Sequence, residues 1–226
     1  TIGWITSELV RRTTGLTIGQ WLAKNIAEPN DLSLHIGVPE AKLGKVARVQ
    51  LRDQKGTSEE LAKHAVEGSA GWKALTLNGL ISIIPGGEPY DLNRPEVQVL
   101  ELAGAGMVAD ARSLAAFYSN CIDESQRTRL LSDAIITNAT RPISTGLQFG
   151  DSVPGPAWGA GVMVPWPIQP MLSESSFGHD GFGGNLAIAD PRYGVGFAYI
   201  RNSLPPGGVI DQEVYSVVDA LRSILD

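Results

Sequence analysis

Apolar residues at helical spacing predict two helices at the start of the chain. Ile5, Leu9 and Val10 fall on one face of the first helix. Gly15 is expected to end this helix, because glycine adopts the left-handed conformation of a helix C-terminus without steric cost. A second helix is predicted within residues 17–29, where a threonine can cap its start and a proline stops it.

The same periodicity predicts three more helices further along the chain. A Thr-Ser-Glu-Glu capping box opens a short helix over residues 57–66, and longer helices are expected over 110–119 and 124–137. Residues 30–56 are expected to form a long surface excursion with short extended pieces, and residues 84–95 a loop. The buried face of the helix over 110–119 is expected to comprise Leu114, Phe117 and Tyr118.

Short apolar runs punctuated by glycine replace the helical pattern in the last third of the chain. Residues 158–164, 185–189 and 193–200 are predicted to be three neighbouring strands, with a hairpin turn at 190–193. A strongly amphipathic pattern predicts a final helix over 214–225.

This order of elements indicates an α+β fold. Helices come first, then neighbouring strands, then one helix, and the alternation typical of a parallel α/β sheet is missing. The chain accordingly divides into a mostly helical region, 1–150, and a region of strands and a final helix, 151–226.

Composition narrows the possible partners. The chain has 226 residues, 43% of them hydrophobic, and a net charge of −6, so no nucleic-acid partner is expected. No run of about 18 apolar residues predicts a membrane span. The single cysteine, Cys121, excludes an intrachain disulfide. It weakly favours a cytoplasmic location without excluding export, and oligomeric state and compartment stay open.

Only one of the three histidines lies in a segment that suggests chemistry. His35 is expected to point out of an extended segment, and His64 to lie on a solvated helix face. His179 stands beside Asp180 within a run of glycines, where a ligand can approach the backbone closely and N–H groups can act as donors. A tight glycine turn with an exposed histidine explains the same pattern, so the residues alone leave both readings open.

The sequence lacks the motifs of several enzyme classes. The sequence contains no Gly-x-Ser-x-Gly elbow, no His-Glu-x-x-His pair, no Cys/His cluster and no phosphate-binding loop followed by Lys-Ser/Thr. The glycines at 181, 183 and 184 precede a predicted strand and not a helix, so a phosphate cradle at a helix terminus is excluded. We expect no metal and no cofactor.

A family resemblance rests on residues 177–185, which read Phe-Gly-His-Asp-Gly-Phe-Gly-Gly-Asn, together with 187–191 and 194–197. These segments resemble the C-terminal third of serine hydrolases of the β-lactamase/penicillin-binding family. They are most similar to esterases related to class C β-lactamases, in which His-x-Gly replaces the Lys-Thr-Gly of the third catalytic motif. Upstream segments agree in kind and order, so the resemblance covers nearly the whole chain: 3–15, 28–40, 92–96, 109–115 and 158–161.

The resemblance implies a β-lactamase/DD-peptidase-like fold, with an antiparallel sheet flanked by helices and both regions forming part of one catalytic domain. This family uses a Ser-x-x-Lys nucleophile and a tyrosine motif. The sequence contains no Ser-x-x-Lys, and Tyr118-Ser119-Asn120 lies where the family has no catalytic tyrosine. We therefore expect the chain to lack the N-terminal part of the fold, to need that upstream segment as a partner, and to be inactive alone.

The resemblance also assigns roles to five residues. His179 and Gly181 would form the third motif in the cleft, and the N–H of Phe182 would contribute to the oxyanion hole. Asp180 and Trp158 would contact substrate. Since lactamases place a hydroxyl at the position of Asp180 to hold a carboxylate, like-charge repulsion predicts a carboxylesterase for small neutral esters and not for penicillins.

Two alternatives remain. The chain could be a non-catalytic scaffold or binding protein that keeps the fold, or an acyltransferase that uses the same site. Ser-x-x-Lys upstream would favour the enzyme and its absence the scaffold. Fluorophosphonate labelling of the isolated chain would contradict a nucleophile outside it. The physiological substrate cannot be read from the sequence, because pockets are built by variable loops such as 30–56 and 141–157.

Overall fold

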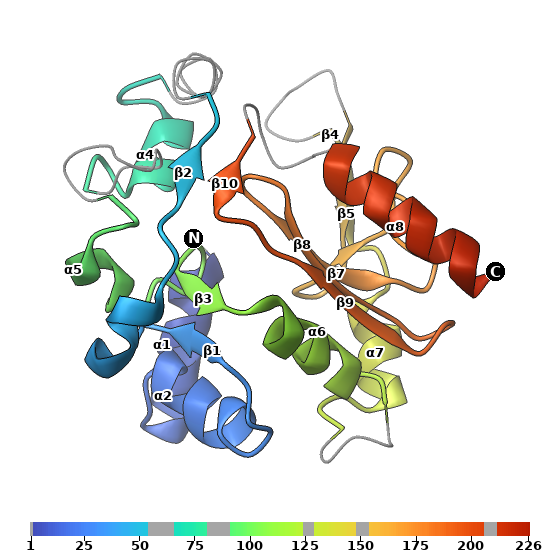
Figure 1. The fold of residues 1–226 in the computed structure, drawn as a ribbon, viewed down its shortest axis with the longest axis horizontal. Coiled ribbons are helices and arrows are strands. Elements are labelled where there is room, and N and C mark those ends of the chain that lie inside the picture. Colours follow the sequence, from blue (N-terminus) through green and yellow to red (C-terminus); the bar gives the residue numbers. More distant parts are fainter. Residues whose placement is uncertain (1, 54–65, 81–90, 124–128, 148–153, 206–211) are drawn as a thin grey trace. The chain divides into compact units, whose positions relative to one another are not determined.

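The protein is described here by a computed structural model that covers every residue except 1, 54–65, 81–90, 124–128, 148–153 and 206–211 (Figure 1). Two compact units make up the chain. Unit 1 comprises Thr1–Asp110 and Arg201–Gly208, and unit 2 comprises Ala111–Ile200 and Val209–Asp226. The predicted regions, 1–150 with mostly helices and 151–226 with strands and a final helix, describe the order of elements and stay a prediction.

Unit 1 is built from short helices and two small sheets. One sheet pairs β1 (Leu34–Ile36) with β3 (Met107–Ala109) antiparallel, and the other pairs β10 (Ser203–Leu204) with β2 (Gln50–Leu51) parallel. The helical elements described are α1 (Ile2–Thr14), α2 (Ile18–Leu22), a π-helical turn η1 (Ala23–Ala27), a 3₁₀ helix η2 (Glu40–Lys45), α4 (Ala70–Thr76) and α5 (Pro95–Gln98).

The first predicted helix forms as α1, but its predicted buried face is wrong. Ile5 and Leu9 are 53% and 57% exposed. The buried residue is Gly3, where an added Cβ would lie 2.5 Å from the backbone nitrogen of Gly104. The helix therefore approaches its neighbour through a residue without a side chain, a contact that apolar periodicity does not reveal.

The second predicted helix is confirmed, together with its cap. Thr17 accepts a hydrogen bond from the Gln20 N–H, and the Gln20 side chain returns one to the Thr17 N–H. Glu101 adds a long-range anchor, because its carboxylate accepts from the Thr17 hydroxyl at 2.6 Å and from the Gly19 N–H at 2.9 Å. This helix start is tied to a segment more than 80 residues away.

Unit 2 contains a six-stranded antiparallel sheet in the order β4-β5-β6-β7-β8-β9. The sequence predicted three neighbouring strands. The strands are β4 (Ser144–Leu147), β5 (Pro154–Trp158), β6 (Met163–Val164), β7 (Phe177–Gly181), β8 (Asn185–Asp190) and β9 (Val195–Tyr199); the helices are α6 (Ala111–Asn120), α7 (Asp133–Ala139) and α8 (Gln212–Leu225). An α+β fold with an antiparallel sheet and helices is confirmed.

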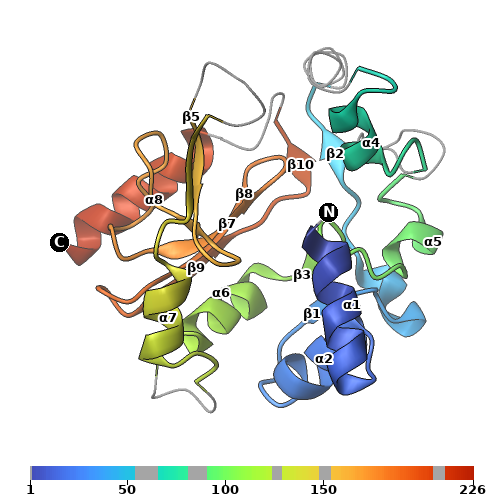
Figure 2. The ribbon, with the colours of Figure 1, turned by 180° about the vertical axis from the view of Figure 1, so that it is seen from behind.

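Helices lie on opposite faces of the sheet of unit 2 (Figure 2), and alternate residues of the central strands pack against them. On one face, Leu186 and Ile188 join Val214 and Val218 of α8 in a core whose members are at most 2% exposed. On the other face, Phe177 and Ala189 pack with Cys121 and with the half-buried Phe117 and Tyr118 of α6. The sheet is therefore the middle layer of unit 2.

Two sequence predictions in unit 2 are corrected. Residues 158–164 do not form one strand, since β5 ends at Trp158 and β6 starts at Met163, with Gly161 in the left-handed region between them. Of the helix expected over 124–137, residues 124–128 lie outside the described residues, and the described part becomes helical only at Asp133, where the hydroxyl of Ser132 caps α7 by accepting from the Ile135 N–H.

Other predictions are confirmed. The helix over 110–119 is α6, although Leu114, Phe117 and Tyr118 are half-buried and not fully buried. The strands at 185–189 and 193–200, the hairpin turn between them and the final helix also form. The helix predicted over 57–66 falls almost entirely outside the described residues, as do His64 and residues 84–90 of the predicted loop.

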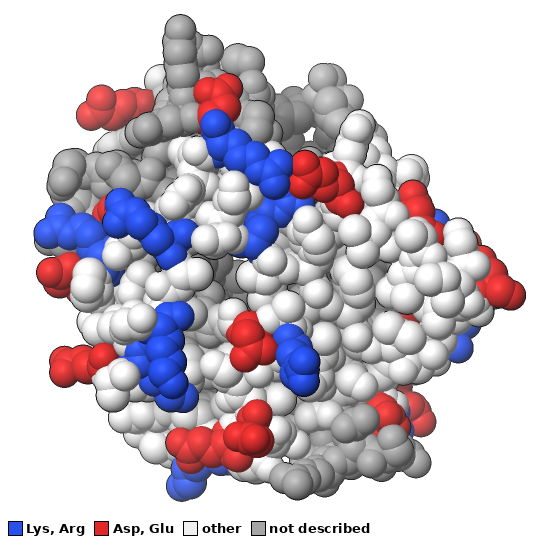
Figure 3. All heavy atoms as spheres, viewed as in Figure 1, with Lys and Arg blue, Asp and Glu red and all other residues white. Residues whose placement is uncertain are grey.

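Charge and hydropathy on the described residues are unremarkable. Basic and acidic side chains are interspersed on the face drawn in Figure 3. None of the helices in the described ranges has the length and apolar character needed to cross a bilayer.

The close packing of α6 on β9 yields a stability prediction. A Cβ at Gly196 would lie 2.3 Å from the Ala115 carbonyl oxygen and 2.4 Å from the Ser119 nitrogen. Gly196→Ala is therefore expected to lower the free energy of unfolding by about 1–3 kcal/mol, measured by urea denaturation. Gly44→Ala is the matched control, because an added Cβ there meets nothing within 4 Å. Equal effects of the two substitutions would contradict this account of the α6–β9 contact.

Candidate active site

Strand β7 carries three of the five predicted site residues, and its register fixes where they point. It pairs with β8 through five residue pairs, which place His179 opposite Ala187 and Asp180 opposite Leu186. Gly178 is required within the strand, because a Cβ there would lie 2.1 Å from the Ala187 carbonyl oxygen. In the sequence the glycines around His179 suggested close approach of a ligand or a tight turn; in the structure Gly178 allows close packing of two strands.

His179 is the accessible member of the polar pair. Its side chain is 55% exposed, and its ring lies 5.3 Å from the Trp158 ring, centroid to centroid, at an interplanar angle of 61°. Nδ1 contacts the backbone carbonyl oxygen of Asp180. A carbonyl oxygen only accepts hydrogen bonds, so Nδ1 carries the proton and Nε2 keeps its lone pair when the imidazole is neutral.

Asp180 is buried beside His179. It is 5% exposed, and its Oδ2 accepts a hydrogen bond of 3.1 Å from the Gln169 side chain. Burial raises the pKa of the Asp180 carboxyl, while the hydrogen bond from Gln169 and the charge of His179 act in the opposite direction. Burial also raises the pKa of Tyr215 on α8, and the nearby Asp180 charge adds to this effect.

The turn that follows β7 places Phe182 next to the strand end. Gly183 and Gly184 both have φ of +81°, a left-handed conformation that side chains rarely adopt, so glycine is needed at both. Asn185 donates from Nδ2 to the Phe182 carbonyl oxygen at 3.0 Å, which holds the peptide between Phe182 and Gly183. His179, Asp180, Gly181 and Phe182 are consecutive in unit 2, and Trp158 contacts the His179 ring. The Asp180 side chain is buried, so it is not exposed for the direct contact with substrate that the resemblance implied.

Two residues of this arrangement were missed in the sequence, Trp166 and Gln169. The Gln169 side chain is fully buried, and its Oε1 accepts from the indole N–H of Trp166 at 2.9 Å. The only sequence signal is a lone glutamine in a proline-rich segment, 165–170, which by itself predicts a loop.

The other candidates from the sequence lie elsewhere. The His35 Nε2 is 3.3 Å from the Lys42 ammonium, and burial, followed by that charge, lowers the pKa of His35. Tyr118 packs in the core beside Cys121, where burial raises the pKa of its hydroxyl; burial also raises the pKa of the Cys121 thiol to about 12. In the part of the chain that the structure describes, no group of three or more His, Cys, Asp or Glu side chains could hold a metal ion.

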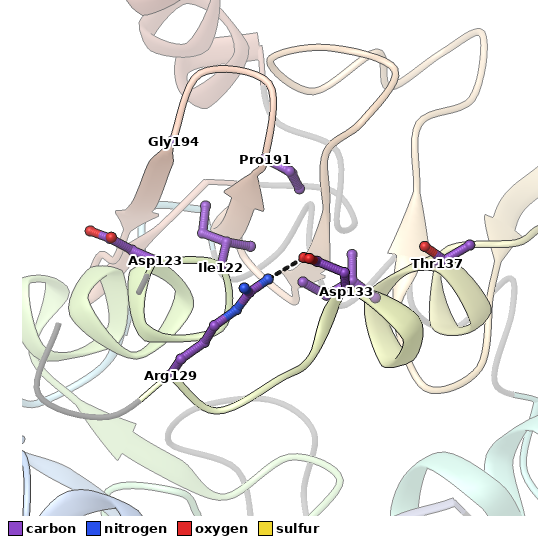
Figure 4. A pocket seen from close by; sticks show the side chains of 8 residues that line it. Ile122, Asp123, Arg129, Asp133, Thr137, Pro191 and Gly194 are labelled. Atoms are coloured by element: carbon purple, nitrogen blue, oxygen red, sulfur yellow. Dashed lines mark hydrogen bonds and ion pairs between the residues drawn. The ribbon is translucent and has the colours of Figure 1, made fainter. Parts of the chain in front are cut away.

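A cavity of about 540 Å³ lies apart from these residues (Figure 4). It is lined by residues that follow α6, by α7 and by the β8–β9 turn, with Ile122 and Pro191 among its walls. Arg129 forms an ion pair with Asp133 across it. None of the five predicted site residues lines this cavity.

Comparison with solved structures supports the same architecture. EstA from Arthrobacter nitroguajacolicus Rue61a is 25% identical to this chain, and the two structures superpose with a TM-score of 0.77. The match covers 100% of this chain and 58% of the EstA chain. A novel penicillin-binding protein homolog from Caulobacter crescentus is 25% identical, with a TM-score of 0.74. This match covers 98% of this chain and 56% of the homolog. A family VIII carboxylesterase, at 21% identity, shares the fold with a TM-score of 0.70. This match covers 96% of this chain and 55% of the carboxylesterase.

Sequence comparison agrees. The esterase/beta-lactamase LipL of Mycobacterium tuberculosis (strain ATCC 25618 / H37Rv) is 27% identical over 230 residues, which cover 90% of this chain and 47% of LipL. The chain thus spans about half the length of this relative. The family model described as Beta-lactamase matches residues 1–221. The chain therefore belongs to the β-lactamase family.

Proposed function

We propose that this chain supplies the third-motif side of the active site in a serine-dependent carboxylesterase that acts on small neutral esters. The observation that carries the proposal is the exposed His179 on β7, followed by a glycine turn that begins with Phe182. Membership of the β-lactamase family, and relatives that are named esterases, support it.

The nucleophile is assigned to a part of the protein outside these 226 residues. The sequence contains no Ser-x-x-Lys, and the relatives are about twice as long as the matched region. In the proposed reaction, a serine hydroxyl attacks the ester carbonyl and gives up its proton to a neighbouring base. The tetrahedral intermediate expels the alcohol, which takes up a proton, and water then hydrolyses the acyl-enzyme to the acid and free serine.

Two groups of this chain act on that sequence of steps. The N–H of Phe182 donates to the negatively charged oxygen of the tetrahedral intermediate, together with a second N–H from the nucleophile segment. His179 accepts a hydrogen bond at Nε2, from substrate or from the hydroxyl groups of the catalytic apparatus. Trp158 packs against the His179 ring and thereby limits its rotation.

Asp180 is proposed to set the preference for neutral substrates through its charge. Its carboxylate is 5% exposed, so it acts on the acyl group through the protein interior and not by direct contact. A charge is felt over a longer distance in such a medium than in water. An acyl group that carries a carboxylate is therefore disfavoured, which separates this site from one that binds penicillins.

The first prediction concerns substrate charge in the complete enzyme. A short-chain neutral ester is expected to have a kcat/KM at least about tenfold above that of a matched ester with a carboxylate in its acyl part, which corresponds to about 1.4 kcal/mol. Asp180→Asn is expected to narrow this ratio, because it removes the charge and keeps the side-chain size. A β-lactam turned over as fast as the neutral ester would refute the assignment.

A fluorophosphonate is expected to label a serine outside these 226 residues.

A second prediction isolates the oxyanion-hole N–H. Phe182→Pro removes the donor, whereas Phe182→Ala removes the ring and keeps the donor. Loss of one such donor lowers kcat by about 100- to 1000-fold, so the proline variant should fall by this amount relative to the alanine variant. Circular dichroism of both variants controls for folding. Equal kcat values in two folded variants would exclude this role for Phe182.

A further inference from the structure

We propose that one face of α1 is the docking surface for the nucleophile-bearing part of the protein, which lies outside these 226 residues in the same polypeptide. We call it the α1 apolar face, and it consists of the side chains of Ile2, Trp4, Ile5 and Leu9. The inference rests on the proposed function for the identity of its occupant. It names the surface of this chain on which the other part of the active site is anchored.

The amphipathic pattern of α1 is inverted with respect to unit 1. Ile2, Ile5 and Leu9 recur at the spacing that places side chains on one side of a helix. All four side chains of the α1 apolar face are between 49% and 70% exposed. A surface helix of a folded domain normally turns such an apolar stripe towards the core.

The side of α1 that packs against unit 1 carries smaller and more polar groups. Gly3 is buried against Gly104, the hydroxyl oxygen of Ser7 is buried, and Val10 is half-buried. Figure 2 shows α1 on the near side of unit 1, in front of β1 and β3. The helix therefore contacts its own unit mainly through small residues and leaves its four large apolar side chains exposed.

An ion-pair cluster borders the α1 apolar face. Glu8 pairs with Arg11 at 2.8 Å and with Arg12 at 2.6 Å, so the last turns of α1 are hydrophilic. An exposed apolar patch with a polar rim is typical of a surface that a further protein segment covers.

The comparisons indicate the occupant. The matches cover 98–100% of this chain but only 56–58% of EstA and of the Caulobacter crescentus homolog, so these proteins contain further chain beside the shared fold. Residues 2–9 span only about 10 Å of helix. Separate chains that associate stably bury about 800 Å² on each partner, whereas a segment of the same polypeptide needs less because its effective concentration is high. A face of this size therefore suits a segment in the same polypeptide better than a second copy.

The test is the reactivity of a thiol at position 9 in the complete, folded protein. Leu9→Cys is treated with a maleimide, and mass spectrometry follows the peptide that carries residue 9, so reaction at the native Cys121 does not interfere. Ile135→Cys on α7 is the matched control, because Ile135 is exposed to a similar extent in this chain, 51% against 57%. A covered thiol reacts only during local opening, so Leu9→Cys is expected to react at least about tenfold more slowly than the control, each relative to its rate in urea.

A photo-crosslink identifies what covers the face. A benzophenone amino acid replaces the aromatic Trp4 of the complete protein, and cross-links are expected to residues outside these 226 in the same molecule. A cross-linked dimer would assign the face to a second copy and overturn the proposal. Equal labelling rates of Leu9→Cys and Ile135→Cys in folded protein would also overturn it.

Fluorophosphonate labelling tests the proposed function separately. A serine labelled outside these 226 residues, together with a freely reactive Leu9→Cys, would keep the function and reject the docking surface. A protected Leu9→Cys in a protein that no fluorophosphonate labels would reject the nucleophile and keep the docking of the outside segment on α1.

Discussion

The pairing register between β7 and β8 determines which member of the His179–Asp180 pair is accessible. Successive side chains of a strand point to opposite faces, so a slip of one residue would bury the imidazole and expose the carboxylate. The absence of a Cβ at Gly178 permits the observed register, because the Ala187 carbonyl oxygen occupies the space a side chain would need. The chemistry of the site thus depends on a packing constraint one residue away from the histidine.

The same constraint explains how much the sequence could reveal. The residues around His179 and the β8–β9 hairpin could be predicted, because a polar pair among glycines and two apolar runs around a turn are local signals. The buried face of α1 could not be predicted, because it depends on the contact between Gly3 and Gly104, which belong to distant segments of the chain. Helix α7 starts at Asp133 because Ser132 caps it there, and a single serine carries little information about where a helix begins.

Trp166 and Gln169 illustrate a second limit of sequence reasoning. Neither residue belongs to a motif, and their importance comes from a chain of hydrogen bonds in which each donor determines the orientation of the next group. Such a chain of hydrogen bonds appears only in the three-dimensional structure, since the sequence of a proline-rich loop shows no partner for the indole N–H. Because Gln169 and Asp180 are both buried, this polar contact also constrains the loop that leads into β7.

The substrate preference proposed for Asp180 depends on the protonation state of its side chain. Only an ionised carboxylate disfavours an anionic acyl group through its charge. Burial raises the pKa of this carboxyl, so the preference is lost as the pH falls through that raised value and is present above it. One buried charge therefore sets the preference, and a hydroxyl at this position could not replace it because a hydroxyl is neutral and can donate a hydrogen bond to a carboxylate.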